Sequence, residues 1–135
     1  MDLVRRKLRY NSFMNKSGFD RALEKALREL PSVFRDALDN VAIIVEDQPP
    51  QWLLDELEVP EDETIYGFYH GIPLPQRSVQ DSGNLPDNIS IYRTPLEEDF
   101  PDPSELAEEI RVTLLHEIGH YFGMDEEELE KLGYS

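Results

Sequence analysis

The sequence predicts an α+β domain in which a small mixed sheet of about three strands packs against a long helix, with another helix near the N-terminus. Segments whose apolar residues recur every three or four positions alternate with short β-branched runs, in the order helix, strand, helix, strand, strand, helix, helix. The chain has 135 residues, of which 39% are hydrophobic, and this fits a single domain, residues 1–135, with a modest core.

Residues 1–16 are expected to be irregular and mobile, and the first helix starts at Ser17 or Asp20 and runs to about Ala37. Its apolar positions have helical spacing: Phe19, Leu23, Leu27, Leu30, Phe34 and Leu38. Pro31 interrupts this pattern, so one kinked helix and two short helices both fit the sequence.

The run Val41–Val45 is apolar and rich in β-branched residues, which predicts a buried strand. Two prolines follow and end it. Residues 51–58 then predict one or two turns of helix, with Trp52 and Leu53 facing the core.

Two further strands are expected, at residues 64–70 and 88–93. In the second of them, Ile91 and Tyr92 should lie on opposite faces of the sheet. The intervening residues 71–88 are rich in proline and polar residues, which predicts a long loop, and long loops in compact domains are often functional.

The long helix is expected to run from about Ser104 to Phe122. Ser104 would be its N-cap, with acids such as Glu105 in the first turn. Gly123 can end it, because glycine readily adopts the left-handed conformation of a helix C-terminus. A last short helix is predicted at residues 125–132.

The net charge of −16 is unevenly spread along the chain. Residues 1–35 hold nine Lys and Arg against four Asp and Glu, a net +5, and the remaining residues hold four against 25, a net −21. One interpretation is a solvated acidic surface with a basic first helix packed on it. Another is a basic N-terminal arm, Arg5, Arg6, Lys7 and Arg9, that meets an acidic partner. Nucleic acid is not expected as a partner, because so many carboxylates repel phosphates.

The chain contains no cysteine, which excludes disulfides, thiolate zinc sites and cysteine nucleophiles. A transition metal would therefore be bound by His, Asp and Glu. The N-terminal stretch MDLVRRKLRY lacks the apolar run of a secretory signal, and no segment is long enough to cross a bilayer. A cytoplasmic location without a membrane partner is the resulting expectation.

The segment 116–120, HEIGH, predicts a zinc site on one face of the long helix. His116 and His120 are four residues apart, so their imidazoles can converge on one ion at about 2.0–2.1 Å each. Glu117 points about 100° around the helix, where it cannot easily be a ligand but can reach a water activated by zinc. The pattern HExxH is expected by chance in well under ~1% of chains of this length.

The pattern continues to Gly123 and Glu126, as H-E-x-x-H-x-x-G-x-x-E. A glycine with positive φ can reverse the chain after the helix, so that a residue three positions later returns toward the metal. Glu126 is therefore the expected third ligand and Asp125 the fallback. An exposed acid at the start of the last helix is the alternative interpretation of Glu126.

Gly119 lies between the two histidines, and a glycine in mid-helix costs about 1 kcal/mol relative to alanine. This cost is tolerated more easily if another group must approach the helix backbone there. Apolar residues around it should bury the helix and orient the ligands: Leu114, Leu115, Ile118 and Phe122.

The chain resembles the minimal zincin-like metallopeptidase family, small bacterial proteins with an HExxHxxGxx[DE] motif. The resemblance is carried by Leu115–Leu129, with weaker support from Tyr66–Leu74 and Leu85–Arg93, and it extends from about residue 19 to the end. It implies a reduced zincin fold, one zinc ion per chain held by His116, His120 and the acid at position 126, and hydrolysis of a peptide or protein substrate.

In the implied mechanism, Glu117 is the general base that takes the proton of the zinc-activated water. The family resemblance also implies that the strand before the long helix, Ile89–Arg93, is the sheet edge that pairs with an extended substrate. Four residues are candidates for stabilising the oxyanion, with a packing role as the alternative for each: His70, Tyr69, Tyr92 and Tyr134.

The alternative function is a zinc-binding protein with weak or no turnover that acts as a protein-interaction module. The small size of the chain motivates this alternative.

Overall fold

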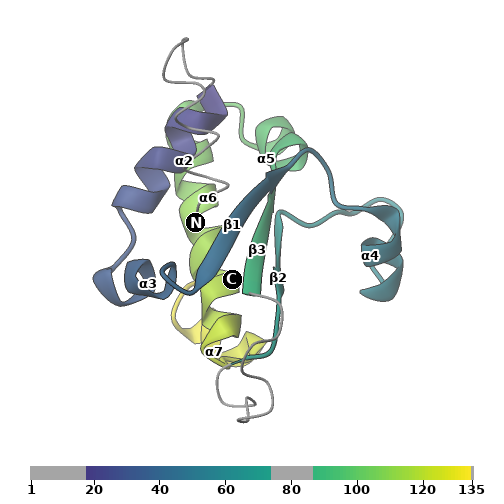
Figure 1. Ribbon diagram of the computed structural model, residues 1–135. Coiled ribbons are helices and arrows are strands. Elements are labelled where there is room, and N and C mark those ends of the chain that lie inside the picture. Colours follow the sequence, from purple (N-terminus) through teal and green to yellow (C-terminus); the bar gives the residue numbers. More distant parts are fainter. Residues whose placement is uncertain (1–17, 74–86, 135) are drawn as a thin grey trace.

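The computed structural model describes residues 18–73 and 87–134 (Figure 1). Within these residues the chain forms six helices and a three-stranded sheet, as the predicted α+β class requires. The helices are α2 (Gly18–Arg28), α3 (Ser32–Ala37), α4 (Gln51–Glu56), α5 (Arg93–Asp99), α6 (Pro103–Tyr121) and α7 (Glu126–Lys131). The strands are β1 (Val41–Glu46), β2 (Gly67–His70) and β3 (Asp87–Tyr92). The basic N-terminal arm and most of the predicted long loop lie outside the described residues.

The sheet is mixed and has the strand order β1–β3–β2. β3 pairs in parallel with β1, so that Ile89 lies beside Ile43, and antiparallel with β2, so that Ile89 also lies beside Tyr69. The expectation that Ile89–Arg93 forms the edge for a substrate is therefore wrong, because β3 has a partner on each side. The strand near the long helix with an outward edge in the described sheet is β2.

Pro31 separates two short helices, α2 and α3, because its ring cannot continue the hydrogen bonding of a helix. The guanidinium of Arg35 on α3 donates to the carbonyls of Arg28 and Leu30 at 2.8 and 3.0 Å. These bonds satisfy carbonyls at the end of α2, so the break in the helix leaves fewer unpaired acceptors.

The long helix α6 starts at Pro103, and its N-cap is Asp102 instead of the predicted Ser104. The Asp102 carboxylate accepts from the amides of Ser104 and Glu105, both at 3.1 Å. Pro103 loses nothing at the first helical position, where an amide would have no partner inside the helix. Helix α5, which the sequence analysis did not anticipate, precedes it and buries Leu96.

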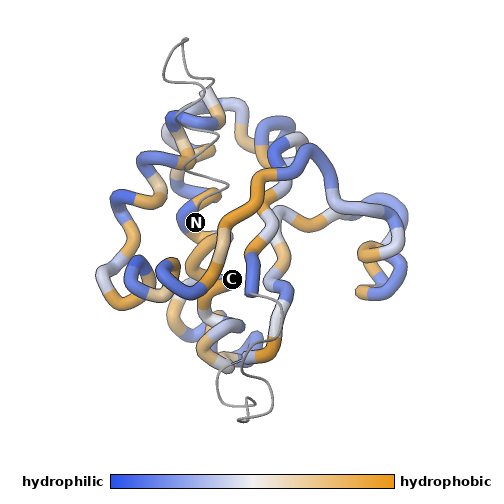
Figure 2. The backbone as a smooth tube through the Cα atoms, viewed as in Figure 1, coloured by the Kyte–Doolittle hydropathy of each residue, from blue (hydrophilic) through white to orange (hydrophobic). Residues whose placement is uncertain are grey.

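Helix α4 contributes little to the core. Leu53 is buried as predicted, but the expectation that Trp52 faces the core is wrong, because its side chain is 60% exposed. Figure 1 shows α4 at the end of a segment that leads away from the sheet, and Figure 2 shows that this segment is largely hydrophilic. A helix of six residues has one apolar stripe, and Leu53 occupies it.

The core lies between α2, α6 and one face of the sheet. The central part of α6 is fully enclosed there, with Leu114, Leu115 and Ile118 at 0% exposure. Gly67 permits the close approach of β2, since a Cβ at this position would lie 2.7 Å from Cγ2 of Thr113 on α6. The fold therefore fixes α6 against the sheet over the turns that carry the histidines. Among the described helices, none combines the length and apolarity needed to span a membrane.

Candidate metal centre

His116 and His120 lie one turn apart on α6, with ring centroids 4.7 Å apart and ring planes at 84° to each other. Their Nε2 atoms are 3.2 Å apart, and both residues are half-buried. The predicted geometry of the pair thus follows from helical spacing, with the neighbouring apolar residues holding this face of α6 in place.

The other ring nitrogen of each histidine contacts a backbone carbonyl. Nδ1 of His116 lies 2.9 Å from the carbonyl oxygen of Tyr134, and Nδ1 of His120 lies 3.1 Å from that of Met124. A carbonyl can only accept, so each Nδ1 must carry the proton and donate it. In the neutral form of each imidazole, Nε2 then keeps a lone pair, which is the state that a metal ligand requires.

Glu126 brings a carboxylate to the same point from α7. Its Oε1 lies 2.8 Å from Nε2 of His120 and 3.3 Å from Nε2 of His116. Gly123 has φ 89°, as expected for a glycine that reverses the chain, and α7 begins three residues later.

Asp125, next to Glu126, is the N-cap of α7. Its side chain accepts from the amide of Glu128 at 2.8 Å, and the Glu128 side chain accepts from the Asp125 amide, which makes a capping box. The carboxylate of Asp125 therefore caps α7, and the group of possible metal ligands among the described residues is His116, His120 and Glu126.

Two of the three separations between these atoms match a small tetrahedral ion, and the third, between Nε2 of His120 and Oε1 of Glu126, is shorter. Tetrahedral zinc with bonds of about 2.0–2.1 Å requires ligand atoms about 3.3–3.4 Å apart. The three separations here are 2.8, 3.2 and 3.3 Å. Two imidazoles and one carboxylate are also a donor set that catalytic zinc sites use, with a fourth position left for water or substrate.

Gly119 allows α7 to pack closely on α6. A Cβ at Gly119 would lie 2.3 Å from Cδ2 of Leu129, which is fully buried. The group that approaches the helix backbone between the histidines is thus the side chain of Leu129, three residues after Glu126. This contact, together with the capping box, holds Glu126 over the imidazoles.

Glu117 is buried beside the histidines and the sheet. Its Oε1 accepts from the amide of Tyr69 on β2 at 3.0 Å, and its Oε2 lies 3.8 Å from Nε2 of His116. Burial raises the pKa of Glu117 to about 8, the charge of Glu126 acts in the same direction, and the Tyr69 amide opposes it. One oxygen is anchored on β2 and the other points toward the histidines.

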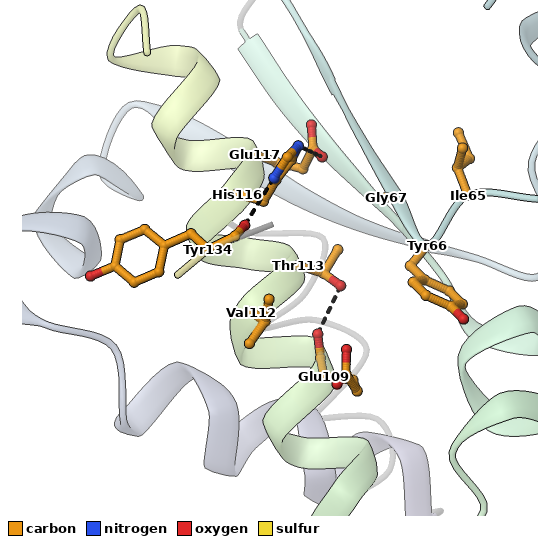
Figure 3. Close-up of a pocket in the computed structure, with 9 residues that line it drawn as sticks. All are labelled: Ile65, Tyr66, Gly67, Glu109, Val112, Thr113, His116, Glu117 and Tyr134. Carbon is orange, nitrogen blue, oxygen red and sulfur yellow. Dashed lines mark hydrogen bonds and ion pairs between the residues drawn. The ribbon is translucent and has the colours of Figure 1, made fainter. Parts of the chain in front are cut away.

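The candidate centre opens into a pocket of about 310 Å³ between α6 and β2. Figure 3 shows His116 and Glu117 near one end and Glu109 near the other, with Tyr66 on the opposite wall. Tyr92 donates its amide to the Tyr66 carbonyl, so in this antiparallel register Gly67 directs its backbone groups away from β3, toward the pocket.

The four oxyanion candidates have the following places. The Tyr69 hydroxyl donates to Asp87 at 2.9 Å, and Tyr92 is almost fully buried. The ring of His70 packs against Phe68, and the ring of Tyr134 packs against Phe34. In Figure 3 the Tyr134 ring points away from the pocket, whereas its carbonyl faces His116.

Three groups at the site were not predicted from the sequence: the amide of Tyr69 and the carbonyls of Tyr134 and Met124. Each acts through the backbone, which is the same in every residue, so the sequence carries no signal for it. Leu129 could have been anticipated, because a glycine between two histidines suggests that a side chain packs there.

A family model of zincin-like metallopeptidases matches residues 38–134, which is more than half of the chain. The match includes β1 and all later elements, and it begins after α2 and α3. It is therefore shorter than the resemblance expected from residue 19 onward. No curated protein matches the chain.

Proposed function

The chain belongs to the zincin-like metallopeptidase family, and from this premise we propose that it hydrolyses peptide bonds with one zinc ion and with Glu117 as the general base. The proposed zinc ligands are His116, His120 and Glu126. The observation that carries the proposal is the convergence of these three donors within 3.3 Å of one another, with the buried carboxylate of Glu117 beside them.

Bound zinc supplies a Lewis acid that polarises the scissile carbonyl and lowers the pKa of a coordinated water towards ~7. Glu117 takes the proton from the attacking water at Oε2 and delivers it to the nitrogen of the leaving amine as the C–N bond breaks. The Tyr69 amide keeps the other oxygen in place during both transfers. Without a cation, burial holds the pKa of Glu117 at about 8, so its carboxyl is mostly protonated at neutral pH. A bound cation would lower this pKa and favour the ionised carboxylate that accepts the proton.

We propose that the substrate chain lies along β2. The outward backbone groups of Gly67 border the pocket, and the amide of Tyr69, two residues on, already binds the general base. An extended peptide added at this edge would pass directly in front of His116 and Glu117. The family resemblance implied Ile89–Arg93 as the substrate edge, and the edge proposed in its place is the neighbouring strand β2.

One observation favours the second candidate, a zinc-binding interaction module with little turnover. None of the four side chains considered as oxyanion donors reaches the candidate centre as a free group among the described residues: Tyr69 donates to Asp87, Tyr92 is buried, and His70 and Tyr134 use their rings in packing. Hydrolysis would then depend on the metal alone to stabilise the oxyanion.

Turnover separates the two candidates. Zinc-loaded protein and its Glu117→Gln variant are incubated with a peptide library, and new amino termini are quantified, with zinc content measured by elemental analysis. We expect about one zinc per chain in both proteins, and cleavage that Glu117→Gln lowers by about 100-fold or more. Equal cleavage by both proteins, or none by either at full zinc content, would overturn the enzyme proposal.

A further inference from the structure

The pocket beside the candidate centre continues along α6 well beyond the histidines. Its lining runs from Glu117 back to Glu109, eight residues earlier on the same helix, or about 12 Å along the helix axis. It is thus long enough for an extended side chain of a substrate whose backbone lies at the Glu117 end.

The middle of this pocket is mostly apolar. Val112 and Thr113 line it from α6, and Ile65 and the ring of Tyr66 line it from the segment that leads into β2. Walls of this kind favour a hydrocarbon stem over a short polar side chain.

The far end of the pocket is acidic. Glu109 is half-buried there, and no Lys, Arg or His side chain among residues 18–73 and 87–134 forms an ion pair with its carboxylate. The Tyr66 hydroxyl on the opposite wall donates to Asp99, which places a second carboxylate behind it. The carboxylates of Glu109 and Asp99 are both negative, so the electrostatic field at this end of the pocket attracts a cation.

The surroundings of Glu109 destabilise the ionised form of its carboxyl group. Burial raises the pKa of its carboxyl, and the neighbouring charges of Glu108 and Glu105 add to the increase. The guanidinium of Arg111, two residues later on α6, binds Glu108 instead. An incoming cation would relieve this repulsion and would favour the ionised form of Glu109.

We infer that this pocket binds a lysine or arginine side chain of the substrate, with Glu109 as the residue that determines the specificity. The inference rests on the proposed function, because it assumes that a peptide lies at the Glu117 end. The aliphatic stem would contact Val112 and Ile65, and the cationic head would reach Glu109.

For a peptide that pairs antiparallel with β2, the direction of this strand assigns the position of the basic residue in the substrate. β2 runs from Gly67 at the pocket to Tyr69 beside Glu117, so a peptide antiparallel to β2 passes Glu117 first and the pocket afterwards. The lysine or arginine then follows the scissile bond, on the side of the leaving amine.

Three peptide hydroxamates test the inference by binding alone. They share a zinc-binding hydroxamate and differ only in the side chain that follows it, which is that of lysine, norleucine or glutamate. We expect zinc-loaded protein to bind the lysine compound about five- to tenfold more tightly than the norleucine compound, and the glutamate compound most weakly. The difference in affinity between the lysine and norleucine compounds should decrease as salt is added, because ions screen the partly exposed pair of the lysine ammonium and Glu109.

Two variants of Glu109 and one matched control assign the preference to this residue. Glu109→Gln should abolish the difference between lysine and norleucine, and Glu109→Lys should make the glutamate compound the tightest. Glu105→Gln removes the same charge one turn earlier on α6, outside the pocket, and should leave most of the preference intact. Circular dichroism checks that all variants remain folded.

Equal affinity for the lysine and norleucine compounds, or a preference that persists in Glu109→Gln, would overturn the inference. Cleavage of a peptide library is measured in parallel. Cleavage without lysine selectivity counts against the pocket assignment alone, whereas lysine-selective binding without cleavage counts against the proposed hydrolysis alone.

Discussion

The candidate ligands come from two helices that are built in opposite ways. Helix α6 has 19 residues, half of them buried, and it carries the two histidines on a face fixed by the core. Helix α7 has six residues, and only Leu129 among them is buried. The same contrast separates the two acids of the site, since the side chain of Glu117 on α6 is 10% exposed and that of Glu126 on α7 is 69% exposed.

This difference indicates which of the candidate ligands is held less firmly. The separation of the two imidazoles is set by a helix that cannot shift without disturbing the core. The position of Glu126 depends on one capping box and one apolar contact, Leu129 against Gly119. We therefore expect substitutions that remove or loosen Glu126 to weaken metal binding in a graded way, and substitutions of the histidines to weaken it most.

The largest effect is expected for zinc affinity when a ligand is removed. His120→Ala should lower the affinity by more than about 100-fold, the upper range for residues that only support a ligand, and Glu126→Ala should lower it less. Competition with a chromophoric chelator measures both. Glu127→Ala changes an exposed neighbour that forms an ion pair with Lys131, and this matched control should have no effect. A greater loss in Asp125→Ala than in Glu126→Ala would move the third ligand to Asp125.

Loss of the Leu129 side chain should release α7 from α6. Leu129→Ala leaves a cavity beside Gly119 and should lower the free energy of unfolding by about 3 kcal/mol, as for other fully buried leucines. Urea denaturation measures this change, and zinc affinity should fall in the folded variant although all three ligands remain. Leu132→Ala, where the side chain is 53% exposed, should be nearly neutral. Unchanged zinc affinity in Leu129→Ala would show that α7 docking does not position Glu126.

The burial of Glu117 should cost stability in the metal-free protein. Its folded pKa of about 8 lies above its ordinary value, so stability should fall as the pH rises toward 8 and the unfolded chain ionises first. Glu117→Gln should therefore raise the free energy of unfolding at pH 8 by about 2 kcal/mol and change it little near pH 4. Bound zinc should shrink this gain, because a cation favours the carboxylate. Glu126→Gln, on the exposed helix, should show no comparable gain, and an equal gain there would remove the contrast between the two acids.

The smallest effect is expected at the cap of α7. Asp125→Ala removes the acceptor for the Glu128 amide and should cost about 1 kcal/mol of stability. Asp125→Asn retains an acceptor and should recover most of this loss, as thermal denaturation would show. Zinc affinity should follow the same order in the two variants. No difference between them would indicate that the cap does not support Glu126.

Much of the fold could be predicted from local patterns. Helical spacing located α2, α3 and α6, and β-branched runs located β1 and β3, because both signals arise from neighbours in the sequence. One error, at Trp52, lies where tertiary contacts decide, and the other, at Ser104, lies in the local choice of the helix cap. Trp52 is apolar but belongs to a helix with one buried stripe, and Ser104 is a good cap that is displaced by Asp102 and the proline after it.

The sequence by itself determined the pair His116 and His120 and the place of Glu117 beside them, because four-residue spacing on a helix has only one geometry. It also indicated Glu126, through the glycine that reverses the chain. Only the tertiary structure decided the rest. It set the strand order that makes β2 the edge, the two carbonyls that orient the imidazoles, and the packing of Leu129 on Gly119. These contacts join residues that are distant in the chain. They depend on backbone atoms and on the complementary shapes of packed groups, and these two factors produce no recognisable pattern in the amino-acid sequence.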